Sequence, residues 1–385
     1  MIVKGADILT PQGQMVSGFV VIEDGRILKV GSHGEFREYP IGGHEVIDAS
    51  GLVAAPGFVD IHVHGGGGHD VLEGTYEAVA AMCQAHARHG TTSLVPTTMA
   101  ASYEELVGAV RTVADAARRG TGGAAVLGVH LEGPWVNPDI RGAQPLGAIR
   151  GANAAELDGL VQASGGLVRM TTVAPELDGA LGFIEAAVRR GIKVSLGHSL
   201  ASFEDVRAAA EAGATHVTHA FNAMGGLHHR SPGIVGAMLA SDDLTTEVIL
   251  DGFHLHPAVA RILYRCKGRD KLALITDATM AAGMPEGEYE LGGQRVTYRD
   301  GAVRLPDGTL AGSALTLDKA VRMAVEALGV SLADAITMAS ATPARVIGVY
   351  DRKGSIEAGK DADLVLIDES VAVRATIVGG VIVYR

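Results

Sequence analysis

Imidazole and carboxylate side chains end a series of short apolar segments spread over more than half of the chain. The segments read GFVDIHVH, AVLGVHLEG, KVSLGHS, THVTHAF and KLALITDAT, and the side chains that end them are His62, His64, Glu132, His198, His219 and Asp277. Divalent cations such as zinc take histidine nitrogen and carboxylate oxygen as ligands. Successive strands of a parallel barrel deliver their last side chains to one rim. The pattern therefore predicts a metal site, and metal-assisted hydrolysis as the class of reaction.

The individual positions support this interpretation to different degrees. His62 and His64 lie two residues apart at the end of a predicted strand, so both rings can face one cation. Glu132 follows an apolar run, where a carboxylate is costly to bury unless a cation or a partner neutralises it. His198 and His219 occupy the same place in two later segments. The alternative for His62 and His64 is a hydrogen-bonded pair of polar residues in a glycine-rich loop. For Glu132 it is a helix cap or a carboxylate paired with an arginine. For His198 and His219 it is a role as core histidines with their hydrogen bonds satisfied.

Asp277 ends the last segment, LITDAT. A carboxylate beside an activated water can accept its proton and later return it to a leaving amine, which makes Asp277 the candidate general base and acid. The alternatives are a further metal ligand or the cap of the following segment. His130 and His216 are expected to point away from the metal or to support its ligands.

A second cluster of polar residues lies in two loops. The string FNAMGGLHHRSPG supplies Asn222 and Arg230, and LDGFHLHP supplies His254. The planar guanidinium of arginine suits a phosphate group, and Arg230, His254 and Arg141 would concentrate positive charge in an acidic protein. This cluster predicts binding of an anionic substrate, with an ordinary solvated loop as the alternative.

The bulk properties restrict the class of protein. The chain has 385 residues, of which 47% are apolar and 20% charged, enough for one large barrel and a small companion domain. The net charge of −12, without a basic stripe, argues against a nucleic-acid partner. The start MIVKGADILT is not a leader peptide, and no membrane span is predicted. Cys83 and Cys266 fall in predicted helices, so we expect a cytoplasmic protein without disulfides.

The order of the predicted elements favours a (β/α)8 TIM-type barrel, an α/β fold, with a small β-sandwich domain formed by both chain ends. The small domain is predicted at 1–52 and 345–385, and the barrel at 53–344 with a β-hairpin insertion at about 287–309. Helical periodicity separates most strands. The eight barrel strands are predicted at 53–63, 93–96, 125–131, 167–173, 193–197, 215–219, 246–251 and 271–276.

Together these motifs resemble the N-acetylglucosamine-6-phosphate deacetylase family of the amidohydrolase superfamily. The likeness covers nearly the whole chain and includes PGFVDIHVHGGGG, GVHLEGPWVNP, LGHSLAS, THAFNAM, LDGFHLHP, ITDATMAAGMPEGEYELGG and GTLAGSALTLD, in family order. The resemblance implies hydrolysis of the N-acetyl group of N-acetylglucosamine 6-phosphate to glucosamine 6-phosphate and acetate. It also implies one or two divalent metal ions, with zinc the first expectation and iron, manganese or cobalt the alternatives.

The resemblance also implies roles for single residues. Glu132, His198 and His219 would hold the principal metal, His62 and His64 would serve a second one, and Asp277 would be the general base and acid. The family implies a homodimer in which Arg230 reaches the neighbouring subunit. The positions that match substrate contacts are Ala143, Asn222, Ala223, Arg230, His254, Leu310, Ala311 and Gly312.

The chain departs from the family pattern at two positions. Gln144 stands where the family usually has a catalytic histidine that polarises the acetyl carbonyl, and a glutamine amide can donate a hydrogen bond but cannot become cationic. Ser231 stands where the family commonly has a glutamate beside the arginine. These departures leave open a deacetylase of N-acetylgalactosamine 6-phosphate, an amidohydrolase acting on a different amide, or a non-catalytic sugar-phosphate binder.

Overall fold

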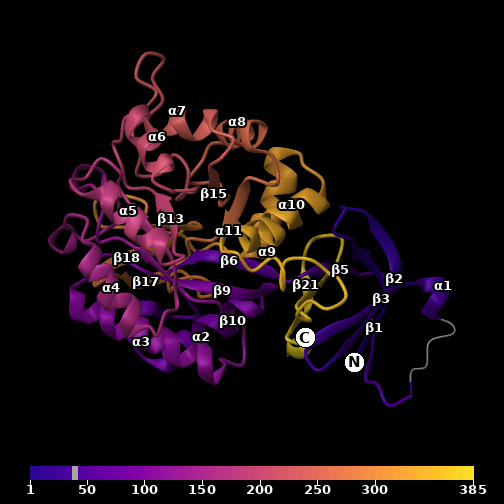
Figure 1. The fold of residues 1–385 in the computed structure, drawn as a ribbon. Helices are drawn as coiled ribbons and strands as arrows, with labels where there is room; N and C mark the ends of the chain where they lie inside the picture. The colour runs from indigo at the N-terminus through magenta and orange to yellow at the C-terminus, as the bar shows by residue number, and fades with distance from the viewer. Residues whose placement is uncertain (37–41) are drawn as a thin grey trace.

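The computed structural model describes residues 1–36 and 42–385, so residues 37–41 of the predicted small domain lie outside it. The chain folds into a ring of strands and helices with a β-rich body at one side, and both termini lie in that body (Figure 1). No helix among the described residues combines the length and the apolar character needed to cross a lipid bilayer.

The larger part is a closed parallel barrel, which confirms the predicted fold class. Parallel pairing runs from β6 through β9 to β16, with the short β10 (Ala125–Val126) beside β9. The ring closes because the Asp277 amide donates to the carbonyl of His62 at 2.9 Å and the His64 amide donates to that of Ala278 at 2.8 Å. The eight strands are β6 (Phe58–Val63), β9 (Thr91–Thr98), β11 (Val129–Glu132), β12 (Val168–Val173), β13 (Lys193–Leu196), β14 (His216–Val217), β15 (Thr245–Ile249) and β16 (Leu272–Ile275).

Helices surround this barrel (Figure 1). Two of them begin at serine capping boxes: Ser102 forms one with Glu105, and Ser202 forms one with Asp205. Each box satisfies free amides of the first turn, which fixes where the helix starts. The helices are α2 (Tyr76–Ala87), α3 (Tyr103–Arg119), α4 (Ala154–Ala163), α5 (Ala180–Arg189), α6 (Phe203–Glu211), α7 (Gly233–Ala240), α8 (Pro257–Lys267), α9 (Leu317–Met323), α10 (Leu332–Ala339) and α11 (Ala341–Val346).

The smaller part is built from both chain ends around one sheet. Its strand order is β22-β21-β20-β5-β1-β2-β3, and β4 also pairs with β1. Ile27 of β3 and Ile377 of β21 come from opposite ends of this order yet share one apolar cluster, because the sheet folds over itself as a sandwich. The elements are β1 (Ile2–Leu9), β2 (Met15–Glu23), β3 (Arg26–Ser32), α1 (His33–Phe36), β4 (Val46–Asp48), β5 (Val53–Pro56), β20 (Leu364–Ile367), β21 (Val373–Val378) and β22 (Val381–Tyr384).

One predicted strand was wrong at its start. The run 53–63 is two strands, because β5 pairs with β20 in the small domain and only β6 belongs to the barrel. Gly57 separates them, and a Cβ atom there would lie 2.2 Å from the side chain of Thr92. The apolar run continues through this junction, so composition alone does not reveal it.

The segment predicted as a hairpin insertion forms a three-stranded antiparallel sheet. Its strands are β17 (Gly287–Leu291), β18 (Gln294–Arg299) and β19 (Ala302–Arg304). Leu291, Val296 and Val303 of this sheet pack against Met99 and Ala311 in one cluster. The sheet therefore covers part of the barrel rim at which the candidate site lies.

Candidate active site

Every residue of the predicted metal set lies at the carboxyl end of a barrel strand or directly after it, and all are buried. Glu132 is the last residue of β11, and Gly133 follows it. His198, His219 and Asp277 come just after β13, β14 and β16, with φ angles of 47°, 27° and 49°. Non-glycine residues rarely occupy this left-handed region, and those that do cluster at functional sites. The backbone thus turns sharply at three strand ends.

Three side chains define the first part of the site. Glu132 Oε1 lies 3.1 Å from His198 Nε2 and 3.0 Å from His219 Nε2, and the two ring nitrogens are 3.1 Å apart. Ligands about 2.0–2.2 Å from one zinc ion have this mutual spacing. The Nδ1 atoms of both rings are buried with no hydrogen-bond partner among the described residues. A carboxylate and two imidazoles converging in this way fit a divalent cation.

A second group adjoins the first through the same carboxylate. His62 Nε2 and His64 Nε2 are 3.3 Å apart, and Asp277 Oδ1 lies 3.4 Å from the former and 3.1 Å from the latter. Glu132 faces this group as well, with 3.4 Å from Oε1 to His62 and 3.3 Å from Oε2 to His64. Glu132 can therefore contact cations in both halves of the site.

The charges of the two groups are strongly coupled. Burial alone would raise the pKa of Glu132, but the charges on His62 and His198 and hydrogen bonds from the histidines hold it well below its usual value. Burial alone would lower the pKa of His64, whereas its hydrogen bonds to Asp277 and Glu132 raise it to about 9. The carboxylates thus hold protons on the imidazoles in the absence of another positive charge. A divalent cation would supply that charge and displace those protons.

A cavity of about 210 Å³ opens above these groups. All members of the metal set except His62 line it, together with seven of the predicted substrate and catalytic positions: Ala143, Gln144, Asn222, Ala223, His254, Leu310 and Gly312. Ala311 is buried in the wall instead, and Arg230 is exposed outside the lining. The sequence interpretation did not include Met99, Leu291 or Thr309, which also line the cavity.

Gln144 is tied to the metal set from one side. Its Nε2 donates to Glu132 Oε2 at 2.7 Å, and its Oε1 accepts from the Ala100 amide at 2.7 Å. The side chain is 1% exposed. One N–H of the amide therefore orients Glu132, and the second N–H is available to a ligand in the cavity.

The predicted phosphate-binding residues are spread over separate loops. His254 Nδ1 is 2.7 Å from Asp251 Oδ2, which orients the ring at the cavity wall. Arg230 is exposed, and its Nη1 lies 2.8 Å from His229 Nε2. Arg141 donates to the carbonyl of Gln144 at 2.8 Å. Within one chain the structure brings His254 to the cavity and leaves Arg230 away from it.

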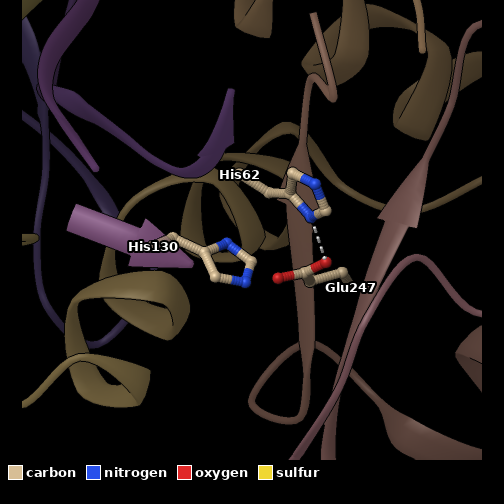
Figure 2. Close-up of side chains that lie close together, drawn as sticks. All are labelled: His62, His130 and Glu247. Atoms are coloured by element: carbon tan, nitrogen blue, oxygen red, sulfur yellow. Dashed lines mark hydrogen bonds and ion pairs between the residues drawn. The ribbon is translucent and has the colours of Figure 1, made fainter. Parts of the chain in front are cut away.

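Sequence interpretation missed a buried acidic residue beneath the site. Glu247, in the middle of β15, is fully buried, and its Oε2 lies 2.9 Å from His62 Nδ1. Figure 2 shows this contact, with His130 beside it. A single charged side chain inside the predicted strand TTEVI was the signal that could have identified it, because a carboxylate in a barrel strand must find partners in the interior.

The sequence matches one known protein family over most of its length. Residues 53–383 match the amidohydrolase family. The chain belongs to that family. It is 39% identical over 373 residues to an N-acetylgalactosamine-6-phosphate deacetylase of Escherichia coli O157:H7, covering 97% of this chain and 96% of the relative. It is 38% identical over 387 residues to an N-acetylglucosamine-6-phosphate deacetylase of Bacillus subtilis (strain 168), covering 100% and 97%.

Solved structures of such deacetylases superimpose on the whole chain. An N-acetylglucosamine-6-phosphate deacetylase from Thermotoga maritima has a TM-score of 0.90 at 34% identity, and the match covers 100% of both chains. A variant of the Mycobacterium smegmatis enzyme, in complex with N-acetyl-D-glucosamine-6-phosphate, has a TM-score of 0.92 at 35% identity, covering 100% and 99%. The backbone of the whole chain therefore has the same fold as proteins of this group.

Proposed function

We propose that the protein hydrolyses the N-acetyl group of N-acetylglucosamine 6-phosphate, releasing acetate and glucosamine 6-phosphate. The observation that carries this proposal is that Glu132, His198, His219 and Asp277 converge at the floor of one cavity. Relatives that share 38–39% identity over nearly the whole chain are named as deacetylases of amino-sugar 6-phosphates.

The cation, Asp277 and Gln144 have separate roles in the proposed reaction. A divalent cation, when bound by Glu132, His198 and His219, would acidify water and polarise the amide carbonyl. Burial alone would raise the pKa of Asp277, but the charge on His62 and a hydrogen bond from His64 lower it, so the carboxylate is ionised at neutral pH. Asp277 accepts a proton from the attacking water and returns it to the leaving nitrogen. Gln144 orients Glu132 and presents its second N–H to the acyl oxygen.

The number and identity of the cations remain part of the proposal. Zinc is the expected metal, with iron, manganese or cobalt as alternatives, because imidazole and carboxylate ligands accept all of them. The spacing of His62, His64 and Asp277 gives a second set of donors beside Glu132. We propose that one or two cations bind per subunit.

We propose that the sugar phosphate is held by Asn222 and His254 of its own subunit and by Arg230 of a second one. No arginine or lysine among the described residues lines the cavity, whereas a phosphate dianion favours a guanidinium partner. The exposed Arg230 lies on a loop outside the lining of its own cavity. A homodimer in which this loop enters the partner's site would supply the missing charge.

Ala143, Ala223, Leu310, Ala311 and Gly312 would shape the wall against the sugar. We also propose a cytoplasmic location. Cys83 is buried, Cys266 is exposed, and both are free thiols, as expected for a reducing compartment.

The second candidate substrate is the galactosamine epimer, because a relative named for that activity matches the chain as closely as one named for glucosamine. Acetate release from N-acetylglucosamine 6-phosphate, N-acetylgalactosamine 6-phosphate and their unphosphorylated forms tests the proposal. We expect the largest kcat/KM for the glucosamine phosphate. Preference for an unphosphorylated amide would refute the substrate class, and binding without acetate release would indicate a sugar-phosphate binder.

A further inference from the structure

The floor of the barrel beneath the site is polar, although small barrels usually fill this layer with branched apolar side chains. His130 Nε2 lies 2.8 Å from the hydroxyl of Thr172, and that hydroxyl lies 2.9 Å from the hydroxyl of Thr218. Glu247 lies in the same layer with 0% exposure. A fully buried carboxylate is strongly disfavoured unless each of its oxygens has a partner, so the contacts of Glu247 indicate what it does there.

The carboxylate of Glu247 forms three hydrogen bonds, and two of them involve candidate metal ligands. Its Oε2 accepts a hydrogen bond from His62 Nδ1 at 2.9 Å and another from the backbone amide of His219 at 3.0 Å. Its Oε1 lies 3.3 Å from His216 Nε2. One carboxylate oxygen thus joins a ligand side chain of β6 to the backbone of the ligand that follows β14.

The hydrogen bond between Glu247 and His62 fixes the tautomer of the His62 ring. When Nδ1 carries the proton donated to Glu247, the lone pair of Nε2 points into the site, 3.4 Å from Glu132 Oε1 and from Asp277 Oδ1. Metal-binding histidines commonly have such a carboxylate on the other ring nitrogen, which sets the tautomer and the ring orientation.

His62, His130 and Glu247 also place donor atoms within 4.8 Å of one another (Figure 2). A separate cation at that point would need Nδ1 of His62 as a ligand while Nε2 serves the main site, which requires a doubly deprotonated ring. His130 already has its Nε2 engaged with Thr172. The 2.9 Å contact between His62 and Glu247 is therefore a hydrogen bond that supports a ligand.

We infer that Glu247 is a positioning residue that presents His62 to a cation held by His62 and His64. Glu247 lies beneath the metal set, on the Nδ1 side of His62, and it is not among the residues that line the cavity. It acts through His62. This inference rests on the cation site of the proposed function.

The test is the zinc affinity of Glu247→Gln, measured by competition with a chelator on the full-length protein. His62→Asn first identifies the binding step that depends on His62. We expect Glu247→Gln to weaken that step about 10- to 100-fold. The control is His130→Gln, which changes a neighbour whose ring centroid is 4.8 Å from that of His62 but which makes no hydrogen bond to it. We expect at most a threefold change there, on the order of ordinary context effects.

The double variant tests whether the effect passes through His62. In a His62→Asn background, Glu247→Gln should have no further effect on zinc affinity. Equal affinities of Glu247→Gln and the wild type, or equal losses in Glu247→Gln and His130→Gln, would overturn the inference. If His62→Asn binds zinc as the wild type does, the His62 cation site itself is refuted, whatever the deacetylase activity.

A measurement on the wild type covers the case in which Glu247→Gln fails to fold. Nitrogen-15 NMR of the histidine rings in the zinc-loaded protein should show His62 protonated at Nδ1 and metal-bound at Nε2. A proton on Nε2 would overturn the inference.

Discussion

Replacing Gln144 with leucine tests how far this residue is structural and how far catalytic. Its two amide hydrogen bonds, to Glu132 and from Ala100, are both 2.7 Å long and buried. Leucine has a volume similar to that of glutamine, so the substitution leaves little empty space that would itself destabilise the fold. Leaving the Ala100 amide unpaired and removing a hydrogen bond to a charged group should together lower the free energy of unfolding by about 3–5 kcal/mol in metal-free protein. With zinc bound to Glu132 the loss should be smaller.

Urea unfolding of the metal-free protein measures the loss, and deacetylation at 25 °C measures the effect on rate. If the second N–H of Gln144 contacts the acyl oxygen, kcat should fall by about tenfold, the value of one neutral hydrogen bond. Gln294→Leu is the matched control, because Gln294 donates one partly buried bond to the carbonyl of Ala143 in the same loop. If metal-free Gln144→Leu unfolds at the same midpoint urea concentration as the wild type, the assigned hydrogen bonds are refuted.

Three further changes test other parts of the structure. Asp277→Asn should retain the metal but reduce kcat about 10²- to 10⁴-fold, and a near-normal rate would exclude Asp277 as the base. Arg230→Ala should raise KM more than it lowers kcat, and activity restored by mixing it with an Asp277→Asn subunit would show that Arg230 acts across a dimer. Burial lowers the pKa of His86 to about 4. As pH falls below 6.5, the imidazole is therefore protonated in the unfolded chain before it is protonated in the folded protein. The free energy of unfolding should then fall by about 2 kcal/mol more in the wild type than in His86→Gln between pH 6.5 and 4.5, and parallel curves would contradict this.

The sequence predicted the metal set because each member ends an apolar run, and the carboxyl ends of parallel strands meet at one rim. The spacing of His62 and His64 was sufficient to place both rings on one side. The same reasoning missed Glu247, because it lies inside a strand and its partners come from β6 and β14. Apolar patterning could not divide 53–63 at Gly57 either, since that boundary depends on which sheet each half joins.

The position of Arg230 shows another limit of sequence reasoning. Its type and motif predict a phosphate contact, and the structure leaves it outside the cavity of its own chain. Whether it reaches a second subunit depends on an interface, and neither periodicity nor spacing within one sequence describes that surface. The role of Arg230 therefore stays a prediction.

The four imidazoles of the site are held in two different ways. His62 and His64 each have a protein acceptor for Nδ1, namely Glu247 and the carbonyl of Thr97. His198 and His219 have no such acceptor among the described residues; left-handed backbone at the strand ends sets their direction instead. The hydrogen bond of His62 to Glu247 can be removed by a single isosteric change, whereas the carbonyl of Thr97 and the left-handed turns belong to the backbone and depend on the packing around them. Substitutions of neighbours should therefore affect the proposed metal binding by His62 more readily than that by His64, His198 and His219.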